Sequence, residues 1–307
     1  MPNKEEILIG CLERWNAADS RIQYFEKNFD EWFSQLPEDI QPIALQLLEM
    51  FEYYSQVKTN QYLKELWLRL GNADGYQHNS SLFTLLPSTY GIANSSFDYL
   101  YSFRQLNNIS KYNVIVDLKT FISTKRKKFD SINNIVIVDD CCGSGNSLDT
   151  FIRNNIDNFR GKHIYYLITY YMKESKEIID RIAEEQNIEI DVIFINSGSR
   201  AFDDDRFSDD RDNLRNVFER SSEELGIVKQ YCLGKYKSEA LISFYNNTPN
   251  NTIGLFWFDS DKYFSLFPRE FENAEGLKRP TPQSMRQDKK KRNIQNYVSA
   301  ARSTKYE

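Results

Sequence analysis

The chain has 307 residues, with 39 lysines and arginines against 44 aspartates and glutamates, and a formal net charge of −5. A composition with 40% hydrophobic and 14% aromatic residues supports one or two domains with a sizeable core, and it excludes disorder throughout. No apolar run approaches the roughly 20 residues that span a bilayer, and the charged N-terminus does not suit a signal peptide. We therefore expect a cytoplasmic protein without a membrane segment.

The few cysteines and histidines limit the chemistry. Cys141 and Cys142 are adjacent and no CxxC pair occurs, so we expect reduced thiols rather than a disulfide framework or a zinc knuckle. With only His78 and His163 in the chain, an HExxH metal site is impossible and most hydrolase templates are disfavoured.

Residues 1–75 are expected to form an N-terminal helical domain. Apolar residues recur at three- and four-residue spacing up to about residue 72, and the turn-rich segment 71–75 suggests a boundary. Part of this region could belong to a DNA-binding helix-turn-helix unit. However, residues 1–72 hold 12 acidic and 7 basic side chains, a difference of −5, whereas a surface that tracks phosphates is basic. Packing or oligomerisation is the favoured role.

From residue 80 the pattern indicates an α/β domain over residues 76–277. Short apolar runs at 82–86, 135–138, 163–172 and 188–195 alternate with helical stretches at 95–106, 147–156 and 173–187. This alternation is typical of parallel strands with helical crossovers, and it predicts a doubly wound, mainly parallel sheet. Two further strands are expected on either side of the loop 246–252. Residues 278–307 contain nine basic and two acidic residues, and we expect them to form a flexible basic tail.

The most informative segment is residues 135–152, which read IVIVDDCCGSGNSLDTFI. Its apolar strand delivers Asp139 and Asp140 to the strand's carboxyl end, where ligands bind in parallel sheets. The Gly/Ser-rich turn that follows opens a helix at about Ser147, which we expect to act as its N-cap. Backbone N–H groups and hydroxyls of such a turn can converge on a phosphate monoester. The residues of this predicted cup are Gly143, Ser144, Gly145, Asn146 and Ser147.

Two well-known phosphate-binding motifs do not fit the segment. No GxxxxGK[ST] lysine is present, and the GxGxxG spacing is not met. Two adjacent carboxylates would repel a phosphate, so their presence suggests sugar hydroxyls or a divalent cation as well. The alternative is an ordinary strand–turn–helix with solvated carboxylates.

Residues 135–147 resemble the ribose-phosphate signature of type I phosphoribosyltransferases. The resemblance implies that Asp139 and Asp140 hold the ribose hydroxyls of phosphoribosyl pyrophosphate as the catalytic acidic pair. It also implies that the turn at 143–147 holds the 5′-phosphate. The chain departs from the family at Cys141-Cys142, where aliphatic residues are usual, and at Gly143, where a small hydroxyl or an acid is usual. The whole arrangement looks like the divergent phosphoribosyltransferase-like proteins of bacterial antiphage and conflict loci, some of them beside retrons.

Two further sites are implied by the same resemblance. A pyrophosphate loop would fall in residues 85–96, with Pro87 and Ser88 as candidates, although the Arg or Lys often found there is missing and an ordinary turn fits equally well. Asn250 and Asn251 could contact an amide-bearing base, or they could simply support a tight turn between two strands.

Several functions follow from these expectations. A catalytic protein would transfer a phosphoribosyl group to or from a nitrogenous base, or cleave the glycosidic bond of a nucleotide, with Mg²⁺ carried by the diphosphate substrate. A non-catalytic alternative is a regulatory or toxin–antitoxin-type module that binds a nucleotide and acts through its helical domain or basic tail. The possible partners are a protein or nucleic acid of a defence complex, or further copies of the chain.

Overall fold

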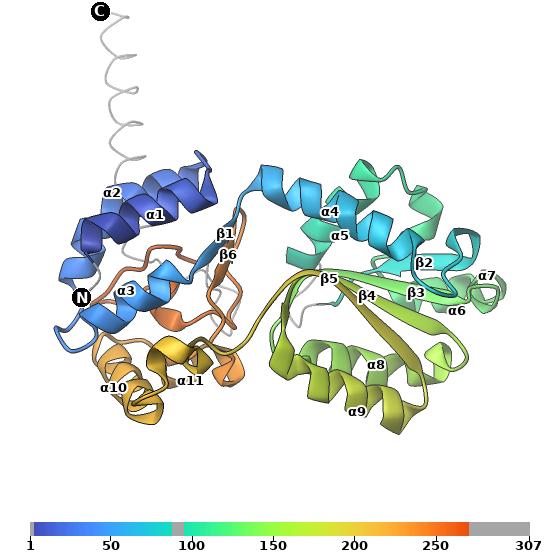
Figure 1. The fold of residues 1–307 in the computed structure, drawn as a ribbon. Helices are drawn as coiled ribbons and strands as arrows, with labels where there is room; N and C mark the ends of the chain where they lie inside the picture. Colours follow the sequence, from blue (N-terminus) through green and yellow to red (C-terminus); the bar gives the residue numbers. More distant parts are fainter. Residues whose placement is uncertain (1–2, 88–94, 270–307) are drawn as a thin grey trace, which may run out of the picture.

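The computed structural model describes residues 3–87 and 95–269, and Figure 1 shows two lobes side by side. The sheet lobe comprises residues 56–87 and 95–198. The mixed lobe comprises residues 3–54 and 199–269, and so combines segments from both ends of the described chain. The expected basic tail, residues 278–307, lies outside the described residues.

The sheet lobe is built on four parallel strands, β2 (Ser81–Thr84), β3 (Asn134–Cys142), β4 (His163–Met172) and β5 (Glu189–Gly198). Their order in the sheet is β2-β3-β4-β5, and every neighbouring pair is parallel. The four apolar runs expected to form strands all do so. β3 and β4 are almost entirely buried, as expected for central strands covered on both faces.

Helices cover both faces of this sheet. Helices α4 (Gln56–Gly71) and α5 (Ser95–Leu106) pack on the face that carries Val136 and Val138. Helices α6 (Leu118–Thr124), α7 (Arg126–Asp130), α8 (Asn146–Phe159) and α9 (Lys176–Gln186) pack on the face that carries Ile135 and Ile137. Successive residues of β3 thus feed two different cores, which follows from the two-residue period of a strand. The doubly wound α/β fold is confirmed.

The mixed lobe begins with three helices, α1 (Lys4–Trp15), α2 (Ser20–Ser34) and α3 (Gln41–Glu49), and then the short strand β1 (Glu52–Tyr54). After β5 the chain returns to this lobe through α10 (Arg211–Glu224), α11 (Lys229–Cys232) and β6 (Ile242–Phe244). Strand β6 pairs in parallel with β1, so segments about 190 residues apart in sequence lie side by side. Asn3, Asp19 and Ser55 accept backbone hydrogen bonds as N-caps of α1, α2 and α4.

Two expectations of secondary structure in this lobe are wrong. Residues 1–72 are not helical throughout, because residues 52–54 form a strand. Of the two strands expected around the loop 246–252, the first forms as β6 and pairs with β1, whereas residues 254–256 after the loop form a 3-10 helix, η7. The first error arises because the three-residue strand β1 is stabilised by its distant partner β6 and leaves no periodicity of its own.

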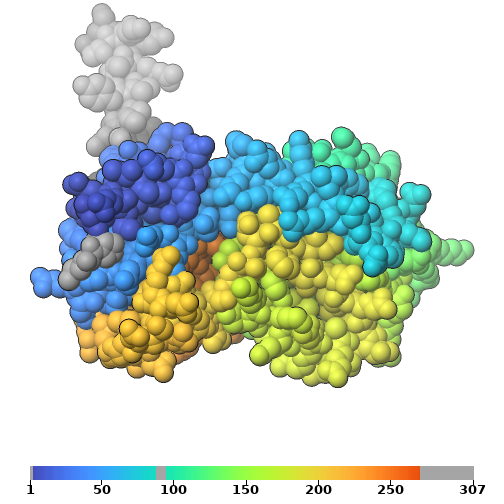
Figure 2. Space-filling view, in the orientation of Figure 1, coloured from blue at the N-terminus to red at the C-terminus, as the bar shows by residue number. Residues whose placement is uncertain are grey.

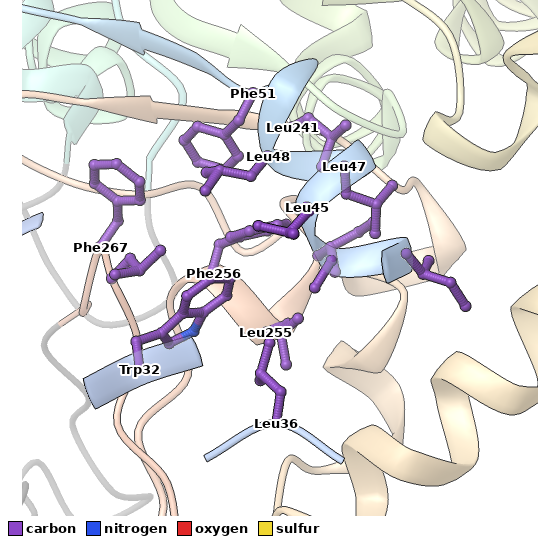
Figure 3. Close-up of a cluster of buried hydrophobic side chains, with 14 of the residues drawn as sticks. Trp32, Leu36, Leu45, Leu47, Leu48, Phe51, Leu241, Leu255, Phe256 and Phe267 are labelled. Atoms are coloured by element: carbon purple, nitrogen blue, oxygen red, sulfur yellow. The ribbon is translucent and has the colours of Figure 1, made fainter. Parts of the chain in front are cut away.

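One hydrophobic core holds the mixed lobe together (Figure 3). The Phe51 ring lies 4.9 Å from the Phe256 ring and 4.9 Å from the Phe267 ring, on which it stacks. Trp32 of α2 also contacts Phe256. Residues before position 54 and after position 200 therefore share their core, and the expected boundary at residue 75 does not separate two cores. Where the chain divides into independently folding units stays a prediction.

Candidate functional site

The acidic pair lies at the carboxyl end of β3, at the side of the sheet that faces the mixed lobe. Both side chains are buried, with Asp139 7% and Asp140 6% exposed. Asp139 accepts three hydrogen bonds: from the Ser96 hydroxyl at 2.6 Å, from the Asp140 backbone N–H at 3.0 Å and from the Tyr166 hydroxyl at 3.1 Å. Asp139 is thus tied to α5 on one side and to β4 on the other.

The surroundings of Asp139 also change its acidity. Burial, together with the negative charge of Asp140, raises the pKa of Asp139 well above its ordinary value. The hydrogen bonds from Ser96 and Tyr166 favour the carboxylate and offset part of this shift. Asp139 is accordingly a fixed neighbour of Asp140 with a raised pKa rather than a freely solvated acid.

Asp140 has fewer partners than Asp139. Within the described part of the chain, its carboxylate accepts one hydrogen bond, from the Cys141 backbone N–H at 2.7 Å. Its remaining acceptor capacity is available to a ligand hydroxyl or a cation. The structure therefore divides the acidic pair into Asp139, whose oxygens are engaged by the protein, and Asp140, which can contact a ligand.

The predicted phosphate cup forms a tight turn into α8. Gly145 adopts a left-handed conformation with φ 81°, which is favourable for glycine, and it takes the N-cap position expected for Ser147. The first backbone bond of the helix runs from Asp149 to Gly145, which leaves the N–H groups before it free of helical partners. Ser144 Oγ accepts from Asn146 Nδ2 at 3.0 Å, so the Ser144 hydroxyl hydrogen can still point to an anion.

Asn251 of the mixed lobe reaches this turn. A Cβ atom at Gly143 would lie 2.1 Å from Asn251 Cγ, so glycine is required by the close approach of that side chain. Asn251 Nδ2 donates to Ser238 Oγ at 3.1 Å, and the Asn250 carbonyl accepts from the Lys235 N–H at 2.8 Å. Asn251 is thus placed beside the cup, whereas Asn250 supports the neighbouring loop with its backbone. Their contact with a base stays a prediction.

The adjacent cysteines point to opposite faces of the sheet, as expected for neighbours on a strand. Cys141 packs with the core beneath α4 and α5, and Cys142 with the core beneath α8 and α9. Burial raises the pKa of the Cys142 thiol to about 11, and burial beside Asp140 and Asp139 raises that of Cys141 well above its ordinary value. Both are therefore neutral thiols that fill space at neutral pH.

The expected pyrophosphate loop is only partly described. Pro87 follows β2 and is exposed, whereas Ser88 lies outside the described residues, as does the rest of 88–94. Among the described residues, no group of three or more His, Cys, Asp or Glu side chains could hold a metal ion, and none of the helices there is long and apolar enough to cross a membrane.

A hollow opens between the lobes, beside the end of β4. It has a volume of about 320 Å³, and Met50, Tyr170, Arg200 and Leu241 contribute to its lining together with residues 203–205. Figure 2 shows the lower edge of the molecular surface notched where the two lobes meet. Neither the acidic pair nor the turn at 143–147 lines this hollow.

Two residues that hold the acidic pair have no signal in the local motif. Ser96 and Tyr166 lie 43 and 27 residues from Asp139 in sequence, and only the strand order brings them to it. The sequence offers one indirect signal for these residues. Ser96 lies in the first turn of a helix that follows a strand, and Tyr166 lies on another strand; neighbouring parallel strands bring such positions together.

A family comparison agrees with this geometry. The model of the family described as PRTase-CE matches residues 29–269, well over half of the chain and parts of both lobes. The chain belongs to the PRTase-CE family. PRTase-CE membership confirms the phosphoribosyltransferase-like assignment, and the matched range includes the acidic pair and the turn.

Some solved structures are distantly similar to this PRTase-CE protein. One of them is a Helicobacter pylori xanthine-guanine-hypoxanthine phosphoribosyltransferase, at 16% sequence identity and a TM-score of 0.33. The similarity covers 54% of this chain and 97% of that chain. No curated protein matches the sequence.

Proposed function

We propose that this protein binds a ligand that contains ribose 5-phosphate, either phosphoribosyl pyrophosphate or a nucleotide, and acts as a phosphoribosyltransferase or as an enzyme that cleaves the nucleotide glycosidic bond. The observation that carries the proposal is the placement of Asp140 directly before the Gly143–Ser147 turn, at the carboxyl end of a central parallel strand. A carboxylate can accept hydrogen bonds from ribose hydroxyls, while a helix N-terminus favours a phosphate.

The roles of the residues follow from their partners. The turn holds the 5′-phosphate, and Asp140 accepts from the ribose hydroxyls. Ser96 and Tyr166 fix Asp139, so that its backbone and carboxylate keep Asp140 in place. As positive charge develops on the sugar in the transition state, the acidic pair stabilises it, and the fixed geometry avoids reorganisation at that moment.

Mg²⁺ would be bound with the substrate. Magnesium commonly takes one or two carboxylates together with substrate phosphates, and Asp140 offers a carboxylate with spare acceptor capacity. When bound, the ion would neutralise the charge of a diphosphate leaving group. The protein's own contribution is the orientation of Asp140 relative to the turn.

The alternative is a binding module without turnover, and one observation favours it. Among the described residues Asp139 accepts three hydrogen bonds from the protein, so its carboxylate has less acceptor capacity left for a sugar hydroxyl than that of Asp140. Such a site would hold a nucleotide with one ligand-facing acid and would signal through the mixed lobe.

Calorimetric titration tests the proposal. The ligands are phosphoribosyl pyrophosphate, ribose 5-phosphate and nucleoside 5′-monophosphates, each with and without Mg²⁺. The wild type should bind phosphoribosyl compounds, and the Ser144→Ala/Asn146→Ala/Ser147→Ala variant should lose that binding. Product analysis with free bases and nucleotides then separates an enzyme from a binding module. Absence of binding by the wild type to every ligand would refute the proposal.

Asp140→Asn provides a sharper test at the sugar. It should abolish product formation while leaving the fold intact, because the substituted amide keeps the side-chain size but loses one acceptor. Asp149→Asn is the matched control, because Asp149 lies in the first turn of α8 and pairs with Arg153, with no described bond to the acidic pair. The control should keep full activity.

We also propose that the protein is an effector in a bacterial antiphage system. What supports this role is the sequence resemblance to phosphoribosyltransferase-like proteins of conflict and retron-associated loci. Phage plating on cells that carry the locus with wild-type protein or with Asp140→Asn tests it. Equal plating on both strains would contradict the role.

A further inference from the structure

A concentrated positive charge lies at the end of the sheet lobe that is remote from the mixed lobe (Figure 1). The connection between α5 and β3 forms the 3-10 helix η2 (Lys111–Asn113) and then the helices α6 and α7. Residues 111–130 of this connection contain six basic and two acidic side chains, a difference of +4, in a chain whose net charge is −5. The six basic side chains are all exposed, and we call them the basic surface: Lys111, Lys119, Lys125, Arg126, Lys127 and Lys128.

Little of this charge is neutralised within the protein. Among the described residues, Arg126 alone of the six has a carboxylate oxygen within 4.0 Å, which is that of Asp130 at 2.8 Å. The other acidic residue of the connection, Asp117, accepts from the Thr120 N–H at 2.9 Å as the N-cap of α6. Clustered exposed cations without internal counter-ions suit the phosphates of a nucleic acid, because binding releases the counter-ions condensed on the polymer.

An exposed aromatic ring lies within the basic surface. Tyr112 is 68% exposed, and the Lys111 ammonium lies 5.3 Å from the centroid of its ring. Lys128 Nζ donates to the Tyr112 carbonyl at 2.8 Å and lies 5.9 Å from the half-buried Phe121 ring. The hydrogen bond joins η2 to α7, so Tyr112 is held among the lysines. Cations interleaved with aromatic rings are typical of surfaces that bind single strands, where phosphates contact the cations and an unpaired base stacks on a ring.

The basic surface and the candidate site lie at opposite ends of β3. Helix α7 ends at Asp130, shortly before β3 begins at Asn134, whereas the acidic pair lies within the last four residues of the strand. No residue that bonds to Asp139 or builds the turn at 143–147 belongs to the basic surface. A polymer bound there is therefore a second ligand, distinct from the ribose 5-phosphate compound of the proposed function.

We propose that the basic surface binds single-stranded nucleic acid, with the lysines on its phosphates and Tyr112 stacked on an unpaired base. An exposed ring contributes nothing to a purely electrostatic contact, so its presence among the cations favours a single strand over an anionic membrane. It also favours a single strand over a duplex, whose bases are already stacked on one another. The inference goes beyond the proposed function and does not depend on it.

Fluorescence anisotropy of the full chain with labelled single strands of about 20 nucleotides, one of DNA and one of RNA, tests the inference. The wild type should bind at least one strand, with an affinity that falls as salt rises. The variant Lys111→Gln/Lys125→Gln/Lys127→Gln removes three charges. Unlike Arg126 and Lys128, these lysines have no described hydrogen bond or ion pair. Because each phosphate contact of a single strand contributes about 0.7 to the slope of log affinity against log salt, the slope should shrink by about 2.

The matched control for charge is Lys27→Gln/Lys64→Gln/Lys173→Gln. These are exposed lysines of α2, of α4 and of the turn after β4, with no described carboxylate within 4.0 Å. The control removes the same charge from scattered positions, and the basic residues 278–307 are present in both triple variants. It should keep the wild-type salt slope. An equal loss of slope in the two variants would overturn the inference, because net charge alone would then explain the binding.

Tyr112→Ala tests the contact with a base. It should weaken binding about 5- to 150-fold, the range of one base stacked on an aromatic ring, and leave the salt slope unchanged. Tyr112→Phe keeps the ring and should keep most of the affinity. The matched control is Tyr236→Ala: Tyr236 is 58% exposed and has the Lys235 ammonium 5.1 Å from its ring centroid, but it lies in the mixed lobe. Equal losses in the two alanine variants would contradict the role of Tyr112.

The remaining outcomes also decide the inference. Absence of binding of the wild type to both strands at low salt would overturn it and would leave the proposed function untouched, because the experiment contains no phosphoribosyl ligand. Inorganic polyphosphate and a duplex of the same sequence serve as competitors. Competition by either one that equals that of the single strand, together with no effect of Tyr112→Ala, would show that the surface recognises negative charge without bases. Circular dichroism verifies the fold of each variant.

Discussion

The two adjacent aspartates have unequal surroundings, and this inequality decides what each can do. Asp139 accepts hydrogen bonds from α5 and β4. Within the residues that the structure describes, Asp140 accepts a single hydrogen bond. The sequence motif correctly predicts that both lie at the end of a strand before a glycine-rich turn into α8. It cannot distinguish them, because the groups that engage Asp139 come from Ser96 and Tyr166, far away in the chain.

The raised pKa of Asp139 predicts a pH-dependent difference in stability. A carboxyl whose pKa is higher in the folded than in the unfolded protein stabilises the fold below the ordinary Asp value of about 3.9, and that contribution is lost as pH rises to the folded pKa. Asp139→Asn lacks this pH-dependent contribution. Its free energy of unfolding should therefore rise relative to that of the wild type as pH rises through this window. Urea denaturation of both proteins at several pH values measures the difference. A difference that is constant or that moves the other way would contradict the raised pKa.

Gly143→Ala should be destabilising because of the Asn251 side chain. The added Cβ would lie 2.1 Å from Asn251 Cγ, so one of the two must move, at a cost of about 1–3 kcal/mol for overpacking. Asn251→Ala alone should lose about 1 kcal/mol with its hydrogen bond to Ser238.

The double variant Gly143→Ala/Asn251→Ala completes the comparison. It should be more stable than the sum of the two single losses predicts, because the methyl group then enters vacated space. Denaturation curves of the four proteins give the coupling, and strict additivity would show that the two residues do not touch.

At the scale of elements, predictability depends on whether a segment carries its own pattern. The runs 163–172 and 95–106 become β4 and α5 with the expected bounds, because buried parallel strands and amphipathic helices are marked by local hydrophobicity. Strands β1 and β6 have three residues each and pair with each other, so β1 carries no pattern of its own, whereas β6 falls in an apolar run that predicts a strand but not its partner. The contact of Asn251 with the turn depends on the same pairing, so the sequence alone does not predict it.

The loop between α11 and β6 is held by a buried ion pair, which can be tested directly. Glu239 is 2% exposed, adopts φ 50°, and accepts from Arg215 Nε at 2.8 Å and from the Phe202 N–H at 3.0 Å. Arg215→Met should cost about 3–5 kcal/mol, because it leaves a buried carboxylate without its partner. Arg215→Met/Glu239→Gln should recover part of this loss.

The matched control for the ion pair is Arg153→Met. Arg153 pairs with Asp149 and Glu185 on the exposed surface of α8 and α9, where water screens the charges. This variant should unfold close to the wild-type midpoint in the same denaturation experiment. A loss at Arg215 no larger than that at Arg153 would show that burial of Glu239 does not control the loop.

At the scale of the whole molecule, the candidate site depends on the packing of the last described residues against the N-terminal helices. Residues 199–269 pack on helices α1 to α3, and the same return places Asn251 beside the turn that follows β3. The mixed lobe is therefore both a folding unit and a wall of the candidate site. Loss of its core should disturb ligand binding as well as stability.

Phe51→Ala tests whether the two ends of the chain fold together. Phe51 packs against both Phe256 and Phe267, and its truncation should cost about 3–5 kcal/mol through lost burial and the cavity that remains. If the mixed lobe is one cooperative unit, hydrogen exchange should accelerate both in α1–α3 and in residues 242–267. The central strands β3 and β4 should keep most of their protection. Faster exchange confined to the first 54 residues would instead indicate an N-terminal domain that folds alone, as the boundary expected at residue 75 requires.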